Sequence, residues 1–240
     1  MFSGKIPYEI SHLSSLVSLD LSLNDGLLIE TPVWKSVIHN LTQLRELLLD
    51  WSDMSSIRPN SSMNLSSSLT TLSLHECNLQ GKLQNNFLCL PNIQTLNLGG
   101  NWNLDLGSFP KCNWSSMALF LDISETRFRG ELLDSIGNMK SLEHLNLAKC
   151  NLTGSILIPL ENLTKLTILD LSYISFSGEI QFPFLNFSCL WHMHELTNFY
   201  FFHYWWIFQQ VCCRCHYLTC PISQLYTLTT INLLVPFLIK

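Results

Sequence analysis

Four cysteines and a histidine lie within nine residues near the end of the 240-residue chain, and these residue types suit zinc. They are Cys212, Cys213, Cys215, His216 and Cys220. Their spacing forms neither two Cys-x-x-Cys pairs nor a Cys/His finger pattern. In an oxidising compartment such thiols form disulfides instead. The cluster therefore predicts no metal site.

Two other polar sets have residue types used in metal binding or catalysis. His192 and His194, followed by Glu195, would line one face of a strand, but two ligands are a weak metal signal. Three aspartates recur in a single register of a repeat, which favours a structural role: they are Asp20, Asp122 and Asp170. The sequence contains no phosphate-binding glycine loop and no nucleophile elbow. We therefore expect no enzyme, no metal and no cofactor.

The composition excludes further classes. Hydrophobic residues make up 47% of the chain, which is enough for a core, so wholesale disorder is not expected. The formal net charge is −5, which gives no basic patch for a nucleic-acid backbone. Leucine occurs 47 times. Such a bias calls for a search for internal repeats.

A Leu-x-x-Leu-x-Leu motif occurs seven times at nearly constant spacing. Its central leucines are Leu19, Leu47, Leu72, Leu96, Leu121, Leu145 and Leu169. Period-2 alternation sends both leucines of each Leu-x-Leu pair to one face of a short strand, and stacked neighbours then bury them. The pattern predicts an α/β solenoid of the leucine-rich-repeat type, a right-handed superhelix with a parallel β-sheet on its concave face.

Five residues after each central leucine, the coil requires a side chain that hydrogen-bonds the backbone of the turn. The residues at this position are Asn24, Ser52, Cys77, Asn101, Thr126, Cys150 and Ile174. Asn both donates and accepts, and Ser or Thr substitutes in part. Cys77 and Cys150 are therefore assigned a structural role. Ile174 has no polar group, which predicts a weakened turn.

The repeats resemble the plant-type extracellular leucine-rich repeat, and residues 44–54, 145–156 and 169–172 are most similar to plant receptor-like proteins of the Cf type. The resemblance covers residues 1 to about 188. It implies a membrane-anchored ectodomain without a kinase domain, facing outward at the plasma membrane. Such proteins recognise apoplastic or pathogen-derived molecules and signal through partner receptor kinases.

A ligand surface is expected on the concave face, which is formed by the outward residues of the strands. Its candidate residues are Ser18, Asp20, Glu46, Asp50, Trp51, His75, Glu76, Asn97, Phe120, Asp122, Glu125, His144, Asn146, Lys149, Asp170 and Tyr173. The exposed aromatics are the expected anchors, because aromatic residues dominate binding hot spots. These are Trp51, Phe120 and Tyr173.

Seven Asn-x-Ser/Thr sequons fit an extracellular setting and predict glycosylation if the chain enters the secretory pathway. They are Asn40, Asn60, Asn64, Asn113, Asn151, Asn162 and Asn186. Asn40 and Asn162 lie seven residues before a central leucine. That phase falls on the outer side of the coil, where a glycan is tolerated.

The two ends depart from the pattern. Residues 1–7 resemble the tail of a repeat and lack the basic start and apolar run of a signal peptide, which predicts an array truncated at its N-terminus. Residues 1–188 form the predicted array. Residues 189–240 contain only three charged side chains, and they predict either a poor membrane segment or an extension added to the array, with the extension favoured.

Three functions remain open from the sequence. The favoured one is a recognition module of a receptor-like protein that binds a protein or peptide in plant defence. The second is a secreted inhibitor of a wall-degrading enzyme. The third is a truncated receptor fragment without activity of its own.

Overall fold

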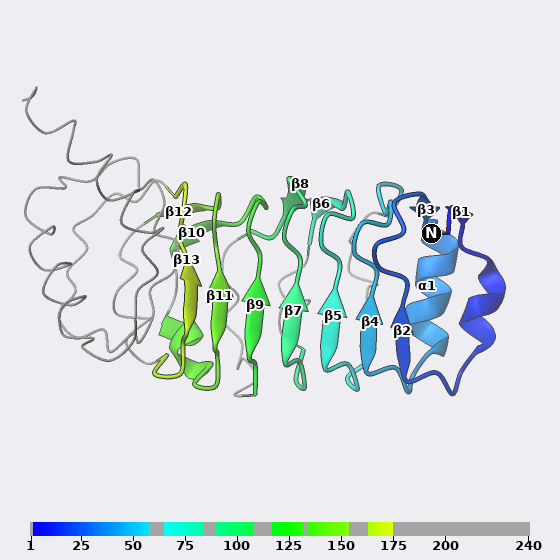
Figure 1. The fold of residues 1–240 in the computed structure, drawn as a ribbon, viewed down its shortest axis with the longest axis horizontal. Coiled ribbons are helices and arrows are strands. Elements are labelled where there is room, and N and C mark those ends of the chain that lie inside the picture. The colour runs from blue at the N-terminus through cyan, green and yellow to red at the C-terminus, as the bar shows by residue number, and fades with distance from the viewer. Residues whose placement is uncertain are drawn as a thin grey trace, which may run out of the picture. The chain divides into compact units, whose positions relative to one another are not determined.

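The structure is a computed structural model that describes residues 2–57, 65–83, 90–107, 117–131, 134–153 and 163–174. Within these ranges the chain runs through a series of stacked coils, and each coil contributes one strand to a shared parallel sheet (Figure 1). The predicted boundary at residue 188 lies outside the described residues. So does the segment 189–240, including Cys212, His192 and the residues predicted with them.

The elements follow the repeat in chain order. They are β1 (Gly4–Lys5), the 3-10 helix η1 (Tyr8–His12), β2 (Ser18–Asp20), β3 (Leu27–Leu28), α1 (Thr31–Asn40), β4 (Glu46–Leu48), β5 (Thr71–Ser73), β6 (Gln80–Lys82), β7 (Thr95–Asn97), β8 (Asn103–Asp105), β9 (Phe120–Asp122), β10 (Arg129–Glu131), the 3-10 helix η3 (Asp134–Asn138), β11 (His144–Asn146), β12 (Asn151–Thr153) and β13 (Ile168–Asp170).

One sheet contains all seven repeat strands, in the order β13-β11-β9-β7-β5-β4-β2. Every neighbouring pair is parallel. The register places each central leucine opposite the next, from Leu19 opposite Leu47 to Leu145 opposite Leu169. The predicted α/β leucine-rich-repeat solenoid with a parallel sheet is confirmed.

The core follows from this register. The central leucines are 0–9% exposed. They belong to one cluster with the flanking aliphatic positions of each motif, such as Leu44 and Leu49. Burying one leucine side chain contributes roughly 1.5–3 kcal/mol. Stability therefore comes from stacking, because each coil covers the leucines of its neighbours.

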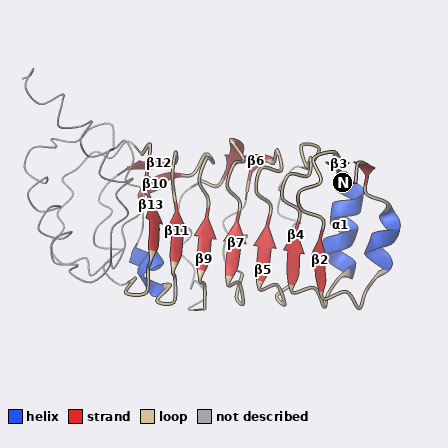
Figure 2. Ribbon diagram, in the orientation of Figure 1, coloured by secondary structure: helices blue, strands red, loops and turns tan. Residues whose placement is uncertain are grey.

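Short parallel pairs form where each coil turns back behind the main sheet. β1 pairs with β3, β6 with β8 and β10 with β12. The first complete coil is closed by α1, which begins at Thr31 with Pro32 in its first turn, a position that suits the fixed φ of proline. Its buried residues Val33, Trp34 and Val37 lie on one helical face. Figure 2 shows this helix beside β2, and the row of repeat strands beyond it.

Candidate recognition surface

We call the outward side of the seven-stranded sheet, together with the turns that follow its strands, the sheet face. Each strand contributes two outward residues, one on either side of its central leucine. The first outward residues are Ser18, Glu46, Thr71, Thr95, Phe120, His144 and Ile168, and the second are Asp20, Leu48, Ser73, Asn97, Asp122, Asn146 and Asp170. Nine of these fourteen were predicted from the sequence. Leu48, Thr71, Ser73, Thr95 and Ile168 were missed, although the same two-residue alternation places them here.

Most second outward residues bind their own backbone. Asp20 Oδ1 accepts the Ser22 N–H at 2.9 Å, and Asp122 Oδ1 accepts the Ser124 N–H at 2.9 Å. Asn97, Asn146 and Asp170 make the same bond two residues ahead. These Asx turns end the strands. The predicted structural role of the recurring aspartates is confirmed.

The acids of this row differ in their freedom to contact a ligand. Asp122 is only 8% exposed, and its Oδ2 accepts a hydrogen bond from Asn146 Nδ2 at 3.0 Å. Asp20 is exposed, and hydrogen bonds from the hydroxyl and N–H of Ser22 lower its pKa. Asp20 is therefore ionised and accessible to a ligand, whereas Asp122 is held in the framework of the sheet.

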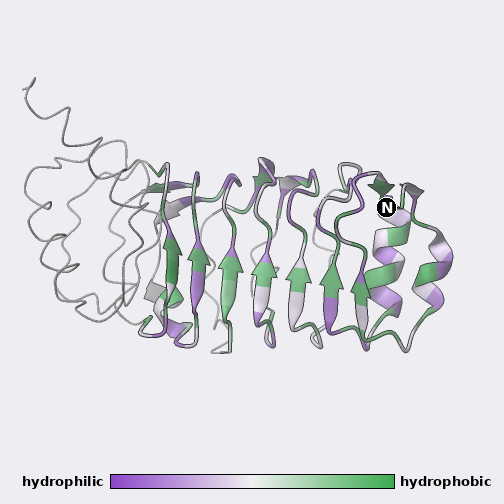
Figure 3. Cartoon of the chain, viewed as in Figure 1, coloured by the Kyte–Doolittle hydropathy of each residue, from purple (hydrophilic) through white to green (hydrophobic). Residues whose placement is uncertain are grey.

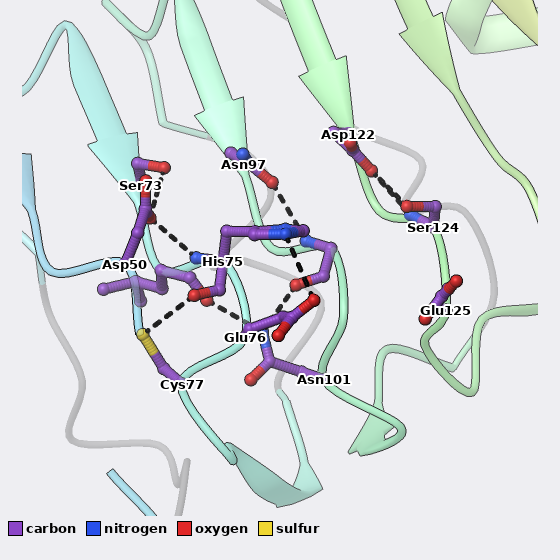
Figure 4. Close-up of polar contacts among 12 residues, drawn as sticks. Asp50, Ser73, His75, Glu76, Cys77, Asn97, Asn101, Asp122, Ser124 and Glu125 are labelled. Atoms are coloured by element: carbon purple, nitrogen blue, oxygen red, sulfur yellow. Dashed lines mark hydrogen bonds and ion pairs between the residues drawn. The ribbon is translucent and has the colours of Figure 1, made fainter. Parts of the chain in front are cut away.

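Asp50 caps the end of a strand that lacks an Asx turn of its own. β4 and β5 end with Leu48 and Ser73, which cannot form an Asx turn. Asp50 Oδ1 instead accepts the Ser73 hydroxyl at 2.6 Å and the His75 N–H at 2.8 Å (Figure 4). One carboxylate of the second coil thereby stabilises the strand end of the third.

After each strand, one residue enters the left-handed region. These residues form what we call the outer turn row: Leu23, Trp51, Glu76, Gly100, Glu125, Lys149 and Tyr173, with φ between 51° and 74°. A non-glycine residue pays about 1–2 kcal/mol for this conformation. Six of the seven N–H groups donate to a carbonyl of the next coil, as in Trp51 N to His75 O at 2.9 Å. These bonds between coils offset the strain.

The next residue of each turn points inward. We call these residues the inner turn row: Asn24, Ser52, Cys77, Asn101, Thr126, Cys150 and Ile174. Asn101 is 1% exposed, and its Nδ2 donates to Leu74 O and Leu98 O, both at 2.8 Å, while its Oδ1 accepts the Leu79 N–H at 2.9 Å. Thr126 Oγ1 donates to Ile123 O at 2.6 Å. The predicted turn-bonding role is confirmed at these positions.

The two cysteines of this row are also structural. Cys77 Sγ donates to Leu49 O at 3.1 Å, and Cys150 Sγ donates to Ile123 O at 3.3 Å. Both thiols are buried and free, and burial raises the pKa of each to about 12. Thiols with such a pKa are poor nucleophiles. The assignment of a structural role to both residues is confirmed.

The middle of the turn rows is tightly packed around two glycines. A Cβ on Gly99 would lie 2.8 Å from Asp122 Oδ1 and 3.1 Å from His75 Nδ1. A Cβ on Gly100 would lie 2.4 Å from Glu76 Cγ. Side chains of the coils on both sides thus occupy the space beside the fourth turn, where a residue larger than glycine would clash with them.

Two aromatic contacts lie on the sheet face. The rings of Trp51 and His75 meet edge to face, with centroids 6.2 Å apart, and Trp51 is 43% exposed. The rings of Phe120 and His144 on neighbouring strands lie 4.3 Å apart with an angle of 31° between their planes. Burial lowers the pKa of His144, so this imidazole is neutral at pH 7.

A third cluster joins four coils. Lys149 Nζ lies 5.0 Å from the ring centroid of Trp102 and 5.6 Å from that of Tyr173. It also pairs with Glu125 Oε1 at 2.5 Å, and this hydrogen bond raises the pKa of Lys149. Trp102 was not among the residues predicted from the sequence. The signal that could have found it is its separation from Lys149 along the chain, which is close to two repeat lengths.

The structure describes two of the seven predicted glycosylation sites. Asn40 is the last residue of α1 and is half-buried, and Asn151 is the exposed first residue of β12. Both lie in the return part of a coil, outside the seven repeat strands. Asn60, Asn64, Asn113, Asn162 and Asn186 lie outside the described residues. Glycosylation stays a prediction at all seven.

A metal-ion site and a membrane-spanning helix are both absent from the described ranges. No group of three or more His, Cys, Asp or Glu side chains there is arranged to hold a metal ion. None of the helices in those ranges has the length and apolarity needed to cross a membrane.

Comparison with known proteins agrees with this architecture. Residues 141–163 match the family model "Leucine Rich Repeat". Receptor-like protein 6 of Arabidopsis thaliana is 38% identical over 152 residues, which cover 61% of this chain and 15% of that protein. Receptor-like protein Cf-9 of Solanum pimpinellifolium is 39% identical over 118 residues, or 49% of this chain and 13% of that protein. Over its repeats, the chain is a relative of the plant leucine-rich-repeat receptor-like proteins.

The chain is also similar to solved structures of plant leucine-rich-repeat ectodomains. The ectodomain of the Arabidopsis thaliana receptor kinase GASSHO1/SCHENGEN3, in complex with CASPARIAN STRIP INTEGRITY FACTOR 2, has a TM-score of 0.61 and 27% identity, covering 75% of this chain and 21% of that one. The Arabidopsis receptor kinase HAESA, in complex with the peptide hormone IDA and the co-receptor SERK1, gives the same TM-score and identity over 75% and 29%. The array spans about one sixth of the length of the curated relatives it matches.

Proposed function

We propose that the chain contributes a recognition surface to a plant cell-surface receptor-like protein, and that this surface binds a peptide or protein ligand during pathogen perception. The sheet face supports this proposal. It combines an uninterrupted row of seven strands with a turn row that contains six residue types at its seven positions, from Leu23 to Tyr173. A constant framework with variable outward side chains is the arrangement that repeat proteins use for binding.

Trp51 and Tyr173 are the proposed anchors. They are 43% and 49% exposed and belong to the second and the seventh turn. Large, rigid aromatic side chains lose little conformational entropy on binding and dominate hot spots. By analogy with the HAESA complex, in which a peptide hormone and a co-receptor are present together, we propose a co-receptor kinase as the signalling partner. The proposed location is the outer side of the plasma membrane.

The experiment selects ligands without assuming their identity. A displayed library of random peptides is enriched on the full chain, and the affinity of the enriched peptides is then measured for Trp51→Ala and Tyr173→Ala. Truncation of an anchor is expected to weaken binding at least about tenfold. Tyr8→Ala is the matched control, because Tyr8 is 48% exposed but lies on η1, away from the sheet face.

Two results would reject the proposed surface. One is unchanged affinity in both anchor variants. The other is an equal loss in Tyr8→Ala, which would place the peptides elsewhere. Circular dichroism of each variant shows that the fold is retained.

A further inference from the structure

The sheet face has two chemically different parts. The acidic part lies over β2, β4 and β5, and it contains the carboxylates of Asp20, Glu46, Asp50 and Glu76. Arg45 precedes Glu46 and supplies one opposing charge. Four carboxylates and one guanidinium give the acidic part a formal charge of about −3 at pH 7, with histidine left out of the count.

The carboxylates of the acidic part are accessible to different degrees. Glu46 is exposed, and its Oε2 accepts the Ser18 hydroxyl at 2.8 Å. The side chain of Glu76 is 41% exposed, and its Oε1 lies 3.6 Å from His75 Nε2. Asp50 is half-buried and holds the Ser73 hydroxyl. Glu46 and Glu76 are thus the two that a ligand cation can reach most directly.

The apolar part lies over β9, β11 and β13. Its first outward residues are Phe120, His144 and Ile168, and Leu119 precedes β9. Leu119 and Ile168 are 39% and 40% exposed, and the neutral His144 ring packs on Phe120. In Figure 3, β13 and the start of β9 have hydrophobic colours, whereas the start of β4 is hydrophilic.

The charges of the apolar part are mostly bound within it. Lys149 pairs with Glu125, Asp122 binds Ser124 and Asn146, and Asp170 caps its own turn. Glu143 precedes β11 and adds one carboxylate at the edge. An apolar ligand side chain therefore meets a surface on which Lys149, Asp122 and Asp170 are already paired or hydrogen-bonded.

The sheet sets the distance between the two parts. β4 and β11 are separated by four strand spacings in the order β4-β5-β7-β9-β11. At about 4.8 Å per spacing, this distance is about 19 Å. An extended peptide advances about 3.3 Å per residue, so about six residues cover it.

We propose that the ligand is an extended peptide segment that crosses the strands, with a basic side chain over the acidic part and an apolar side chain about six residues away over the apolar part. The proposal rests on the proposed function and adds the chemistry and the spacing of the ligand. It commits to a basic partner because the acidic part exposes the carboxylates of Asp20, Glu46 and Glu76. In the apolar part, by contrast, Asp122 is buried and Glu125 is paired with Lys149.

Synthetic peptides test this spacing. Each has about fourteen residues of a Ser/Thr/Gly background, with an Arg pair and a Leu pair whose centres are about three, six or nine residues apart, in both chain directions. Fluorescence anisotropy measures their affinity for the full chain. The spacing of about six residues is expected to bind best, by about tenfold over the other two, and replacing the Arg pair by Glu is expected to abolish that binding.

Variants assign the two ends of the peptide. Glu46→Gln and Glu76→Gln are each expected to lower the affinity for the peptide with the Arg pair about threefold. Neither is expected to change the affinity for the peptide in which Glu replaces the Arg pair. Ile168→Ser is expected to lower the affinity for the peptide with the Arg pair about fivefold through lost apolar contact. The matched controls are Glu9→Gln and Leu13→Ser, which change an exposed acid and an exposed leucine at η1, away from the sheet face.

The outcomes separate this inference from the proposed function. Library-selected peptides that depend on Trp51 and Tyr173 but bind equally with or without basic residues would overturn the inference alone. So would a synthetic series whose affinity ignores spacing. If neither the selected nor the synthetic peptides bind the sheet face, both proposals fail.

Discussion

The inner and outer turn rows consist of adjacent residues in the same turns, yet they face opposite environments. Asn101 is 1% exposed and makes four hydrogen bonds within the coil and to its neighbours. Trp51, in the outer row, is 43% exposed, and its N–H bonds the next coil through the backbone. The outer residue is therefore held by its backbone and the inner residue by its side chain.

This difference explains how one turn serves two purposes. Inner residues such as Asn101, Thr126 and Cys77 present a small hydrogen-bonding group to fixed carbonyls, and the row contains only Asn, Ser, Thr and Cys in six of seven coils. An outer residue must only tolerate positive φ, which leaves its side chain free to be Leu, Trp, Glu, Lys or Tyr. The turn can thus vary in recognition without losing its hydrogen bonds.

The largest expected effect is in the inner row. Asn101→Ala leaves three carbonyls and the Leu79 N–H without their side-chain partner in a buried site. Each unsatisfied buried group costs about 1–3 kcal/mol, so the free energy of unfolding is expected to fall by about 3–5 kcal/mol. Urea denaturation measures this change.

Ser52→Ala is the matched control in the same row. The Ser52 hydroxyl is buried and makes no hydrogen bond within the described ranges, so its removal is expected to change stability by less than about 1 kcal/mol. Similar losses in the two variants would show that hydrogen bonding is not what distinguishes the inner row.

The fold was predictable from the sequence because its signal is repeated. The central leucines recur in seven copies, and the two-residue alternation fixes which face they occupy. The turn-bonding role of Asn101 and Cys77 followed from the same register. A single coil would not have supported either prediction.

The site was predictable only in part, because its contacts join different coils. Glu125, Lys149 and Tyr173 were predicted from the sequence. The contact of Lys149 with Trp102 was not, because it depends on how the coils stack. Asp122 was also assigned to the ligand surface, although this carboxylate is 8% exposed. The position of a residue in the repeat predicts which face of the sheet its side chain occupies. The burial of that side chain depends on its neighbours, such as Asn146 beside Asp122. Whether any of these residues binds a ligand stays a prediction.

A second prediction concerns Gly100, the glycine of the outer turn row. Gly100→Ala places a Cβ at φ +74° and 2.4 Å from Glu76 Cγ. Backbone strain and the displaced Glu76 side chain are together expected to cost about 2–3 kcal/mol in thermal or urea unfolding.

Gly4→Ala isolates the backbone part of that cost. Gly4 has φ +94°, but nothing lies within 4 Å of its added Cβ, so about 1–2 kcal/mol is expected. An equal cost at Gly4 and Gly100 would mean that the close approach of Glu76 contributes nothing.

The third prediction concerns pH and returns to the inner row. Burial raises the pKa of Cys77 and Cys150 to about 12, from an ordinary thiol value of 9.0. Because the folded-state pKa lies above the unfolded one, the stabilisation is complete below about pH 9 and is lost as the pH rises toward 12. Each thiol is expected to contribute a loss of roughly 1.4 kcal/mol by about pH 10, since the unfolded chain releases a proton that the folded chain keeps.

The comparison of Cys77→Ala and Cys150→Ala with the unchanged chain separates the thiols from other groups that titrate at alkaline pH. Each variant is expected to start from a lower stability at pH 7, because a hydrogen bond to Leu49 O or Ile123 O is lost, and then to decline less steeply above about pH 9. Parallel curves for variant and unchanged chain would show that these thiols are not shielded in the fold. The inner row would then not be the closed layer that its hydrogen bonds indicate.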